Sequence, residues 1–174
     1  MNRRTLLQTM ALLPLLPAIR VLASSPEASS HMTDIAFEPL EHSHDYWRDK
    51  VSAQAWHILF EEGTEPAGSS PLDAVYDPGT YVCAACYLPL FQSDDKYDSK
   101  TGWPSFTQPI AGTMGTKRDF KLIWPRTEYH CARCGGHQGH VFNDGPPPRG
   151  ERWCNNGLAL RFIPADQPLP DLRG

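Results

Sequence analysis

The sequence predicts a single β-rich, loop-rich domain, and three observations lead to this prediction. The chain has 174 residues, which is the length of one domain once a leader is set aside. Its 17 prolines and 13 glycines indicate many turns and few long helices. Short apolar runs separated by Gly, Pro, Asp and Asn are typical of strands joined by turns. A domain of this size can form a core without disulfides.

The first 23 residues have the composition of an export signal. Arg3 and Arg4 provide a basic start, Thr5–Leu16 is an apolar run, and small residues follow at the expected cleavage spacing. The run is shorter than the roughly 20 apolar residues that span a membrane, so we expect no stable membrane anchor. The string Asn2–Gln8 resembles a twin-arginine export signal, with an ordinary secretion signal as the alternative. We therefore expect an exported, periplasmic protein.

Residues 24–36 are small and polar and are expected to form a flexible linker. The domain is expected over residues 37–166. Its first clear element is a helix from Ser52 to Glu62, which the Ser52 side chain can cap and which ends before Gly63. Three apolar residues share one face of this helix: Trp56, Leu59 and Phe60.

Beyond this helix the pattern changes to strands. The expected strands cover, in chain order, Tyr81–Val82, Leu88–Phe91, Phe120–Trp124, His140–Phe142 and Leu158–Ile163. Residues 167–174 are expected to form an irregular tail. We expect Trp47, Trp56 and Trp124 to be packing aromatics.

Charge and cysteine count narrow the possible partners. The net charge is −4 and no block of basic residues occurs, so we expect no nucleic-acid partner. A monomer is expected. The five cysteines are an odd number, which leaves at least one thiol outside any complete pairing.

Four of the cysteines form two Cys-x-x-Cys pairs, Cys83 with Cys86 and Cys131 with Cys134. Each pair can direct two sulfurs at one centre about 2.3 Å away, and two pairs complete the tetrahedron that zinc adopts. Because the pairs are far apart in the sequence, we expect them on turns of separate hairpins. Two disulfides and a thioredoxin-like redox pair are the alternatives. One structural zinc ion is expected, which supplies roughly 10–16 kcal/mol of apparent folding free energy in comparable sites.

Cys154 is the cysteine outside these pairs. A zinc site with four cysteine ligands is closed, so the metal cannot carry the chemistry. Arg152 stands two residues before Cys154, and a neighbouring guanidinium raises the thiolate fraction of a thiol whose unperturbed pKa is about 8.5. Taken alone, a single cysteine is more often an inert buried residue than a nucleophile.

The sequence motifs around Cys154 favour a catalytic role over an inert one. Four ordered segments carry the signal: Tyr81–Phe91, Gly102–Phe106, Cys131–Pro146 and Arg152–Phe162, with Gly63–Glu65 upstream. Together they resemble the B-type methionine-R-sulfoxide reductase family, and the similarity runs from about Trp47 to Phe162. Four motifs in one order are far more specific than any one of them.

The resemblance implies a mainly β fold of two antiparallel β-sheets with short N-terminal helices, stapled by the four-cysteine zinc site. It implies reduction of methionine-R-sulfoxide, free or in oxidised proteins, to methionine. By matching position, Cys154 is the nucleophile that becomes a sulfenic acid, and four further residues line its pocket: Trp103, His137, His140 and Asn156. The bland alternatives are that the two histidines cap loops and that Trp103 is a core residue.

Physical roles for these side chains follow from the reaction. The sulfoxide oxygen must be protonated, and an imidazole with a pKa near 6.5 suits that transfer. We expect His140 to be the main proton donor, with His137 assisting it. Asn156 can donate an amide hydrogen bond near the reacting centre, and the face of Trp103 suits the substrate methyl group. The other histidines are expected to be structural: His42, His44, His57 and His130.

Three positions depart from the family pattern. Trp153 stands where a smaller aromatic residue is usual, and Gly157 where serine is common. Thr101 occupies a position where many relatives carry a second, resolving cysteine. With four cysteines committed to zinc, we expect an external thiol, supplied by a thioredoxin-like protein or a periplasmic relay, to reduce the oxidised Cys154.

Two other functions compete with this interpretation of the sequence. One is a zinc-stapled binding module without catalysis, and the other is a general thiol peroxidase.

Overall fold

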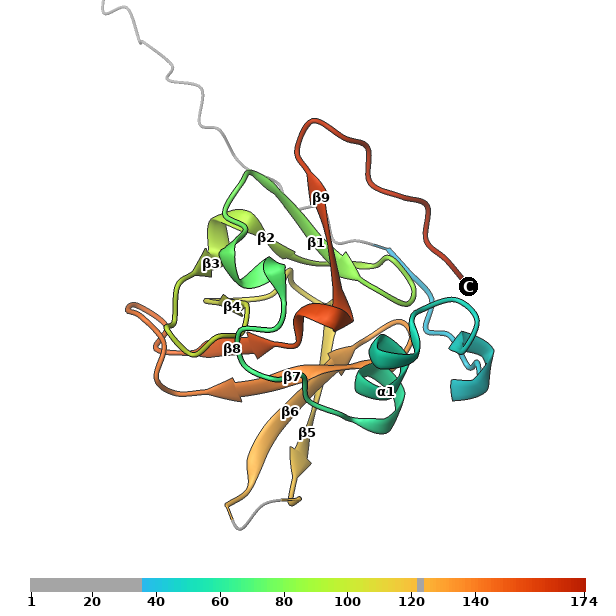
Figure 1. Ribbon diagram of the computed structural model, residues 1–174, viewed down its shortest axis with the longest axis horizontal. Coiled ribbons are helices and arrows are strands. Elements are labelled where there is room, and N and C mark those ends of the chain that lie inside the picture. The colour runs from blue at the N-terminus through green and yellow to red at the C-terminus, as the bar shows by residue number, and fades with distance from the viewer. Residues whose placement is uncertain (1–35, 122–123) are drawn as a thin grey trace, which may run out of the picture. The chain divides into compact units, whose positions relative to one another are not determined.

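The computed structural model describes residues 36–121 and 124–174, and the expected leader over residues 1–23 lies outside this part of the chain, as does the linker but for Ala36. The mainly β fold is confirmed, because the described residues form two antiparallel sheets with a few short helices (Figure 1). No helix among these residues has the length and apolar character needed to cross a bilayer.

The N-terminal side carries the helices. A 3₁₀ turn η1 (His44–Trp47) precedes helix α1 (Ala53–Glu61), and a second turn η2 (Pro71–Ala74) follows. Ser52 caps α1 as expected, since its hydroxyl accepts a hydrogen bond from the Ala55 N–H at 3.1 Å. Glu62, rather than Gly63, takes the left-handed conformation that ends the helix. Gly63 is needed for space instead, because a Cβ there would lie 2.6 Å from the His57 ring.

The smaller sheet has three strands in the order β2-β1-β9. They are β1 (Gly79–Cys83), β2 (Pro89–Gln92) and β9 (Leu160–Pro164). The central residues of β1 and β2 are fully buried, as the apolar runs in the sequence predicted, whereas those of β9 are exposed or only partly buried. A 3₁₀ turn η4 (Gly157–Ala159) leads into β9, so the expected strand over Leu158–Ile163 begins two residues late.

The larger sheet has six strands in the order β3-β4-β8-β7-β6-β5. A short 3₁₀ turn η3 (Ser93–Asp95) precedes it. The strands are β3 (Lys96–Tyr97), β4 (Ser105–Phe106), β5 (Met114–Asp119), β6 (Arg126–Cys131), β7 (His137–Phe142) and β8 (Arg152–Asn155). The order places β8 between β4 and β7, so a strand late in the chain sits in the middle of the sheet.

Aromatic side chains join the two sheets. Phe91 of β2 stacks on Phe106 of β4 with ring centroids 4.0 Å apart, and Tyr81 of β1 meets Phe106 edge-on at 5.0 Å. Tyr129 of β6 also packs against Phe91. Trp47 is fully buried against Phe60, so η1 and α1 close one side of the same core.

Two expectations were wrong. The strand predicted over Phe120–Trp124 does not occur in its described residues, because β5 ends at Asp119 and β6 begins at Arg126. Trp124 is no packing aromatic, since it is 80% exposed. An apolar run at the turn of a hairpin has the same local composition as a buried strand, and periodicity alone does not separate the two.

Candidate active site and metal centre

The two Cys-x-x-Cys pairs lie on turns of separate hairpins, as predicted. Cys83 and Cys86 occupy the β1–β2 turn, and Cys131 and Cys134 occupy the β6–β7 turn. The turns have one backbone pattern, in which the first cysteine's carbonyl accepts from the residue after the second cysteine, at 3.0 and 2.9 Å. That residue has positive φ in both turns, 63° and 72°.

The four sulfur atoms form a cluster that fits a zinc ion. All lie within 4.8 Å of one another, with 3.7 Å between Cys83 and Cys134 and 3.5 Å between Cys86 and Cys131. Bonds of about 2.3 Å in a tetrahedron place sulfurs about 3.8 Å apart. No disulfide joins the five cysteines, and the sulfurs of both pairs converge on one centre, which favours a shared metal site over two disulfides or a redox pair. The structural zinc centre is therefore assigned to these four thiols.

The C-terminal tail supports the first of these turns. Residues 167–174 contain no helix or strand, as expected. Arg173 nevertheless donates hydrogen bonds to the carbonyls of Ala84 and Ala85, at 2.7 and 2.6 Å. Arg133, from the other cysteine turn, donates to the Arg173 carbonyl at 2.6 Å. The tail thus ties the two cysteine turns together.

Cys154 lies in a row of side chains that crosses the six-stranded sheet. Its register partners are His140 on β7 and Ser105 on β4, and His140 is in turn opposite Glu128 on β6. Directly opposed residues point to the same face of a sheet, with Cβ atoms roughly 4.5–5.5 Å apart. The pairing therefore places thiol, imidazole and carboxylate side by side from strands far apart in the sequence.

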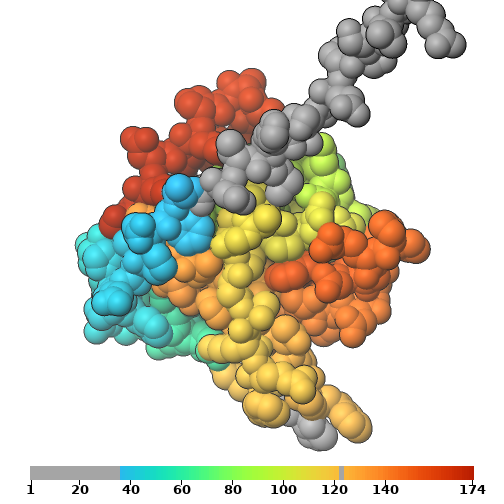
Figure 2. Space-filling view, turned by 180° about the vertical axis from the view of Figure 1, so that it is seen from behind, coloured from blue at the N-terminus to red at the C-terminus, as the bar shows by residue number. Residues whose placement is uncertain are grey.

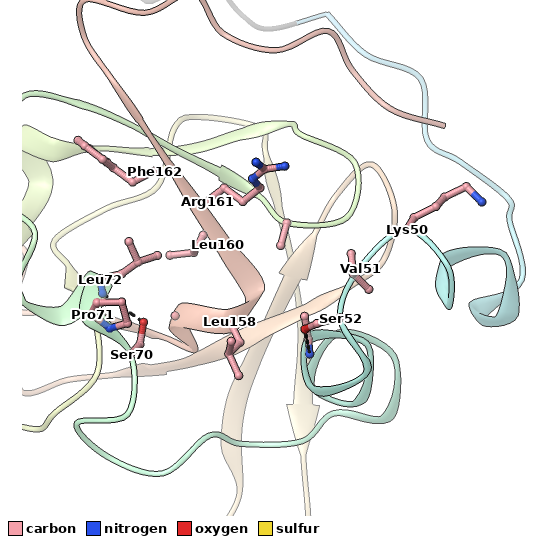
Figure 3. Close-up of a pocket in the computed structure, with 13 residues that line it drawn as sticks. Lys50, Val51, Ser52, Ser70, Pro71, Leu72, Leu158, Leu160, Arg161 and Phe162 are labelled. Atoms are coloured by element: carbon pink, nitrogen blue, oxygen red, sulfur yellow. Dashed lines mark hydrogen bonds between the residues drawn. The ribbon is translucent and has the colours of Figure 1, made fainter.

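A cavity of about 120 Å³ opens over this row. Its lining residues are Thr64, Trp103, Arg126, Gly139, His140, Phe142, Cys154, Asn155 and Asn156. Three of the four residues predicted to surround Cys154 are among them. A larger cavity of about 510 Å³ lies between the start of α1 and β9 (Figure 3), but none of its 13 lining residues is a cysteine or histidine.

His137 corrects the prediction, because it does not line this cavity. It lies behind His140, 2% exposed, with the two ring centroids 5.4 Å apart. A bulge at Gln138 explains the placement: Tyr129 pairs with Gly139 but His130 pairs with His137. The extra residue turns His137 to the same face as His140.

His140 is held by a carboxylate and is uncharged at neutral pH. Its Nε2 is 2.7 Å from Asp119 Oδ2, which also binds Arg126 at 2.6 Å. Burial opposes ionisation of Asp119, yet its hydrogen bonds from Lys121 N–H, His140 and Arg126 outweigh burial and keep its pKa well below the usual range. Asp119 is thus a carboxylate, and His140 Nε2 carries the proton. Burial lowers the pKa of His140 despite Asp119.

The pKa of Cys154 is raised, which corrects the sequence-based expectation. Burial is the largest cause, and the Arg152 guanidinium, which lowers the pKa, only partly offsets it. Arg152 is also committed elsewhere, since it binds both carboxylate oxygens of Asp144 at 2.8 and 2.9 Å. The resting site therefore pairs a neutral thiol with a neutral imidazole.

Glu65 fixes the rim of the cavity. Its buried carboxylate accepts from the N–H groups of Gly157 and Leu158 at 2.6 and 2.9 Å, and its carbonyl accepts from the Trp103 indole at 3.1 Å. Asn156 takes part too, because its amide oxygen accepts from the Glu65 N–H at 3.1 Å. The departure at Gly157 has a steric cause, since a Cβ there would lie 2.0 Å from Ser70 Oγ.

Asn156 uses most of its amide in these contacts. Its Nδ2 donates to the Gln138 carbonyl at 3.0 Å, which leaves one N–H hydrogen for the cavity.

Thr101, at the position where many relatives carry a resolving cysteine, is linked through hydroxyl groups to the row of side chains that contains Cys154. Thr101 contacts Ser99 at 2.8 Å, and Ser99 contacts Ser105 at 2.8 Å.

The remaining histidines and Trp153 lie outside the cavity. His57 pairs with Glu61 on α1, and His42 stacks on Tyr46. His44 packs near Phe60, and His130 contacts the Glu128 carboxylate at 3.2 Å. Trp153 packs edge-on against Tyr129, 4.9 Å between ring centroids.

Sequence reasoning missed the residues that support the row. Asp119 and Glu128 hold the two histidines, with Glu128 2.7 Å from His137 Nδ1. Asp144 and Glu65 hold Arg152 and the rim. Their only sequence signal was presence in or near the motifs, because a carboxylate's partner depends on strand register.

Residues 51–164 match the family model of the SelR domain, which covers more than half of the chain. The chain belongs to the SelR family. A relative in Leptospira interrogans named peptide methionine sulfoxide reductase MsrB is 47% identical over 121 residues, 69% of this chain and 92% of the relative. An Azotobacter vinelandii protein of the same name is 47% identical over 131 residues, 75% and 98% of the two chains.

A similar protein also occurs in a plant. The chloroplastic peptide methionine sulfoxide reductase B1 of Arabidopsis thaliana is 43% identical over 121 residues, 69% of this chain and 60% of the relative. Residues 51–164, which match the SelR domain, hold both the cysteine cluster and the Cys154 cavity.

Proposed function

We propose that this chain reduces methionine-R-sulfoxide to methionine in protein repair, with Cys154 as the nucleophile. The observation that carries the proposal is the cavity in which the Cys154 thiol lies opposite His140, beside Trp103. The curated relatives, which are named peptide methionine sulfoxide reductases, support it. Cys154 is also the cysteine that the metal cluster leaves available.

The charge states of the site suggest the order of the steps. His140 takes the thiol proton of Cys154 as the sulfur attacks the substrate sulfur, because its lowered pKa keeps the imidazole neutral and Asp119 occupies Nε2 alone, which leaves Nδ1 as the accepting atom. The same proton then passes to the sulfoxide oxygen. The protonated oxygen then moves from the substrate sulfur to the Cys154 sulfur, so that the substrate S–O bond and the transient S–S bond break as the S–O bond of the Cys154 sulfenic acid forms. Methionine sulfur is reduced by two electrons and Cys154 sulfur is oxidised by two.

The zinc ion has a structural role in this scheme. Four thiolate ligands leave no open coordination position, so zinc supplies folding free energy and fixes the β1–β2 and β6–β7 turns. Strand β7 begins three residues after Cys134 and carries His140. The metal thus stabilises the strand that presents the imidazole.

Return to the thiol requires a second thiol from outside the chain. The other four cysteines are buried in the metal cluster, and Thr101 offers only a hydroxyl. An external thiol, from a thioredoxin-like protein or a periplasmic relay, attacks the sulfenic acid and releases water, and a further thiol reduces the mixed disulfide.

Export to the periplasm by the twin-arginine route is part of the proposal. It is supported by the pattern of residues 1–23, a paired-arginine start followed by a short apolar run. Folding in the cytosol before export would load zinc first and protect four thiols from disulfide formation.

One experiment separates this function from a binding module and from a thiol peroxidase. The protein is treated with one equivalent of methionine-R-sulfoxide, the S epimer or hydrogen peroxide, without reductant, and dimedone is added before mass spectrometry. Only the R epimer should give rapid stoichiometric labelling at Cys154, with zinc retained. Cys154→Ser should give none, and His140→Ala should slow labelling about 10²–10⁴-fold. Equal rates with both epimers, or a disulfide from Cys154 to a zinc ligand, would refute the proposal.

A further inference from the structure

Two large apolar side chains are exposed beside the active site. Phe120 is 72% exposed and Trp124 is 80% exposed, the highest values for large hydrophobic residues in the described part of the chain. Phe120 follows the last residue of β5, and Trp124 comes two residues before the first residue of β6. The β5–β6 hairpin extends away from the other strands (Figure 1), and its projection is plain from behind (Figure 2).

The turn end of this hairpin belongs to the active site. Asp119 and Arg126 are the last register pair of β5 and β6, joined by an ion pair of 2.6 Å. Arg126 lines the Cys154 cavity, and Asp119 holds His140. Trp124 is two residues from Arg126, which corresponds to at most about 7 Å of extended chain. Phe120 and Trp124 therefore lie in the turn that this register pair closes, next in the chain to residues of the active site.

The hairpin is anchored to the rest of the domain. The carboxylate of Glu62, at the end of α1, binds Lys117 of β5 and Lys121 just beyond it, the latter at 2.6 Å. The two lysines hold the pKa of Glu62 below its usual range, so the contact persists near neutral pH. Thr64, two residues after Glu62, lines the cavity. One segment thus contacts both the rim of the cavity and the turn end of the hairpin.

The size of the cavity determines where a peptide substrate must lie. A space of about 120 Å³ is comparable to the roughly 150 Å³ that holds one benzene molecule. It admits one oxidised methionine side chain but no peptide backbone. Residues on either side of that methionine must lie on the surface around the rim, where Phe120 and Trp124 offer apolar area.

We propose that Phe120 and Trp124 form a docking surface for the apolar residues that flank methionine sulfoxide in an unfolded polypeptide. The inference rests on the proposed function and adds a preference among its substrates. Methionine in folded proteins has mostly apolar surroundings, which become accessible to a surface of this kind when a damaged protein unfolds. The expected contribution is at least about tenfold in kcat/KM, which equals about 1.4 kcal/mol.

The test compares three probes: N-acetylmethionine-R-sulfoxide and two pentapeptides with central methionine-R-sulfoxide, one flanked by leucines and one by serines. The unsubstituted protein should favour the leucine peptide at least about tenfold in kcat/KM. Phe120→Ser/Trp124→Ser should abolish that preference and leave turnover of N-acetylmethionine-R-sulfoxide unchanged. Leu169→Ser is the matched control, since Leu169 is 48% exposed beside the three-stranded sheet. Zinc content and circular dichroism check that each variant is folded.

Four outcomes would overturn the proposal. Two of them are an unchanged leucine preference in the double variant and an equal loss of that preference in Leu169→Ser. Loss of binding to anionic phospholipid vesicles without a change in peptide preference would indicate a membrane surface. A smaller elution volume for the unsubstituted protein than for the variant would indicate a second copy. Anisotropy with labelled peptides, on a Cys154→Ser background, decides the docking even if the protein has no reductase activity.

Discussion

Replacing Glu128 with glutamine removes a buried charge behind the catalytic row. Glu128 is 2% exposed, and its two carboxylate oxygens contact His137 Nδ1 at 2.7 Å and His130 Nδ1 at 3.2 Å. Burial alone would raise the pKa of Glu128, but hydrogen bonds from His130 and His137 outweigh it and lower the pKa to about 2. The folded state therefore stabilises the ionised carboxylate.

The magnitude follows from the difference between folded and unfolded pKa values. A change from 4.5 to about 2 corresponds to about 3 kcal/mol, because each pKa unit equals 1.36 kcal/mol. Because the folded pKa is depressed, this contribution is complete above pH 4.5 and is lost as the pH falls through 2. At pH 3 about 1.4 kcal/mol of it remains by the same relation.

The assay is urea unfolding of the unsubstituted protein and Glu128→Gln between pH 7 and pH 3. The difference in unfolding free energy should be about 3 kcal/mol at pH 7 and shrink by about half at pH 3. Only the difference is used, because acid release of zinc affects both proteins. Glu61→Gln is the control: its pair with His57 is half exposed and should contribute less than about 1 kcal/mol. A difference that does not vary with pH would refute the reasoning.

Two further predictions concern the metal and the thiol. Cys131→Ser should lose zinc and cooperative thermal unfolding, because the roughly 10–16 kcal/mol of metal binding is as large as the stability of most domains. Cys154→Ser should keep both properties. A zinc-free Cys131→Ser variant that unfolds cooperatively at the original temperature would contradict this. Arg152→Met should raise the pKa of Cys154 further, because the guanidinium lowers it. The rate at which iodoacetamide alkylates Cys154 should then rise only at higher pH than in the unsubstituted protein. An unchanged dependence of this rate on pH would show that Arg152 does not act on the thiol.

Much of the fold and the chemistry could be predicted from the sequence. The Cys-x-x-Cys spacing predicted a zinc site at Cys83, Cys86, Cys131 and Cys134 with disulfides or a redox pair as alternatives, and the convergence of the two turns in the structure favours the shared site. The cap at Ser52 is likewise a local property of the helix it begins. Cys154 was identified by elimination and by the motifs around it, and the structure places His140 opposite it.

Properties that depend on strand pairing could not be predicted. The carboxylates of Asp119 and Glu128 reach the histidines through the register of β5, β6 and β7, which no local pattern encodes. The pKa of Cys154 depends on its burial and on the sharing of Arg152 with Asp144, so the proximity of an arginine in the sequence gave the wrong sign for the net change. The sequence around Phe120 and Trp124 has strand-like composition, and only the structure shows that these two side chains face solvent.

The bulge at Gln138 allows His137 and His140 to lie on the same face of the sheet although three positions separate them. In a regular strand, side chains on one face are separated by an even number of residues, so His137 and His140 would point apart. Their odd separation is compatible with a shared face only because one residue is unpaired. Any attempt to transplant this pair of histidines into another sheet must carry the irregularity with them, or the second imidazole will be presented to the wrong side.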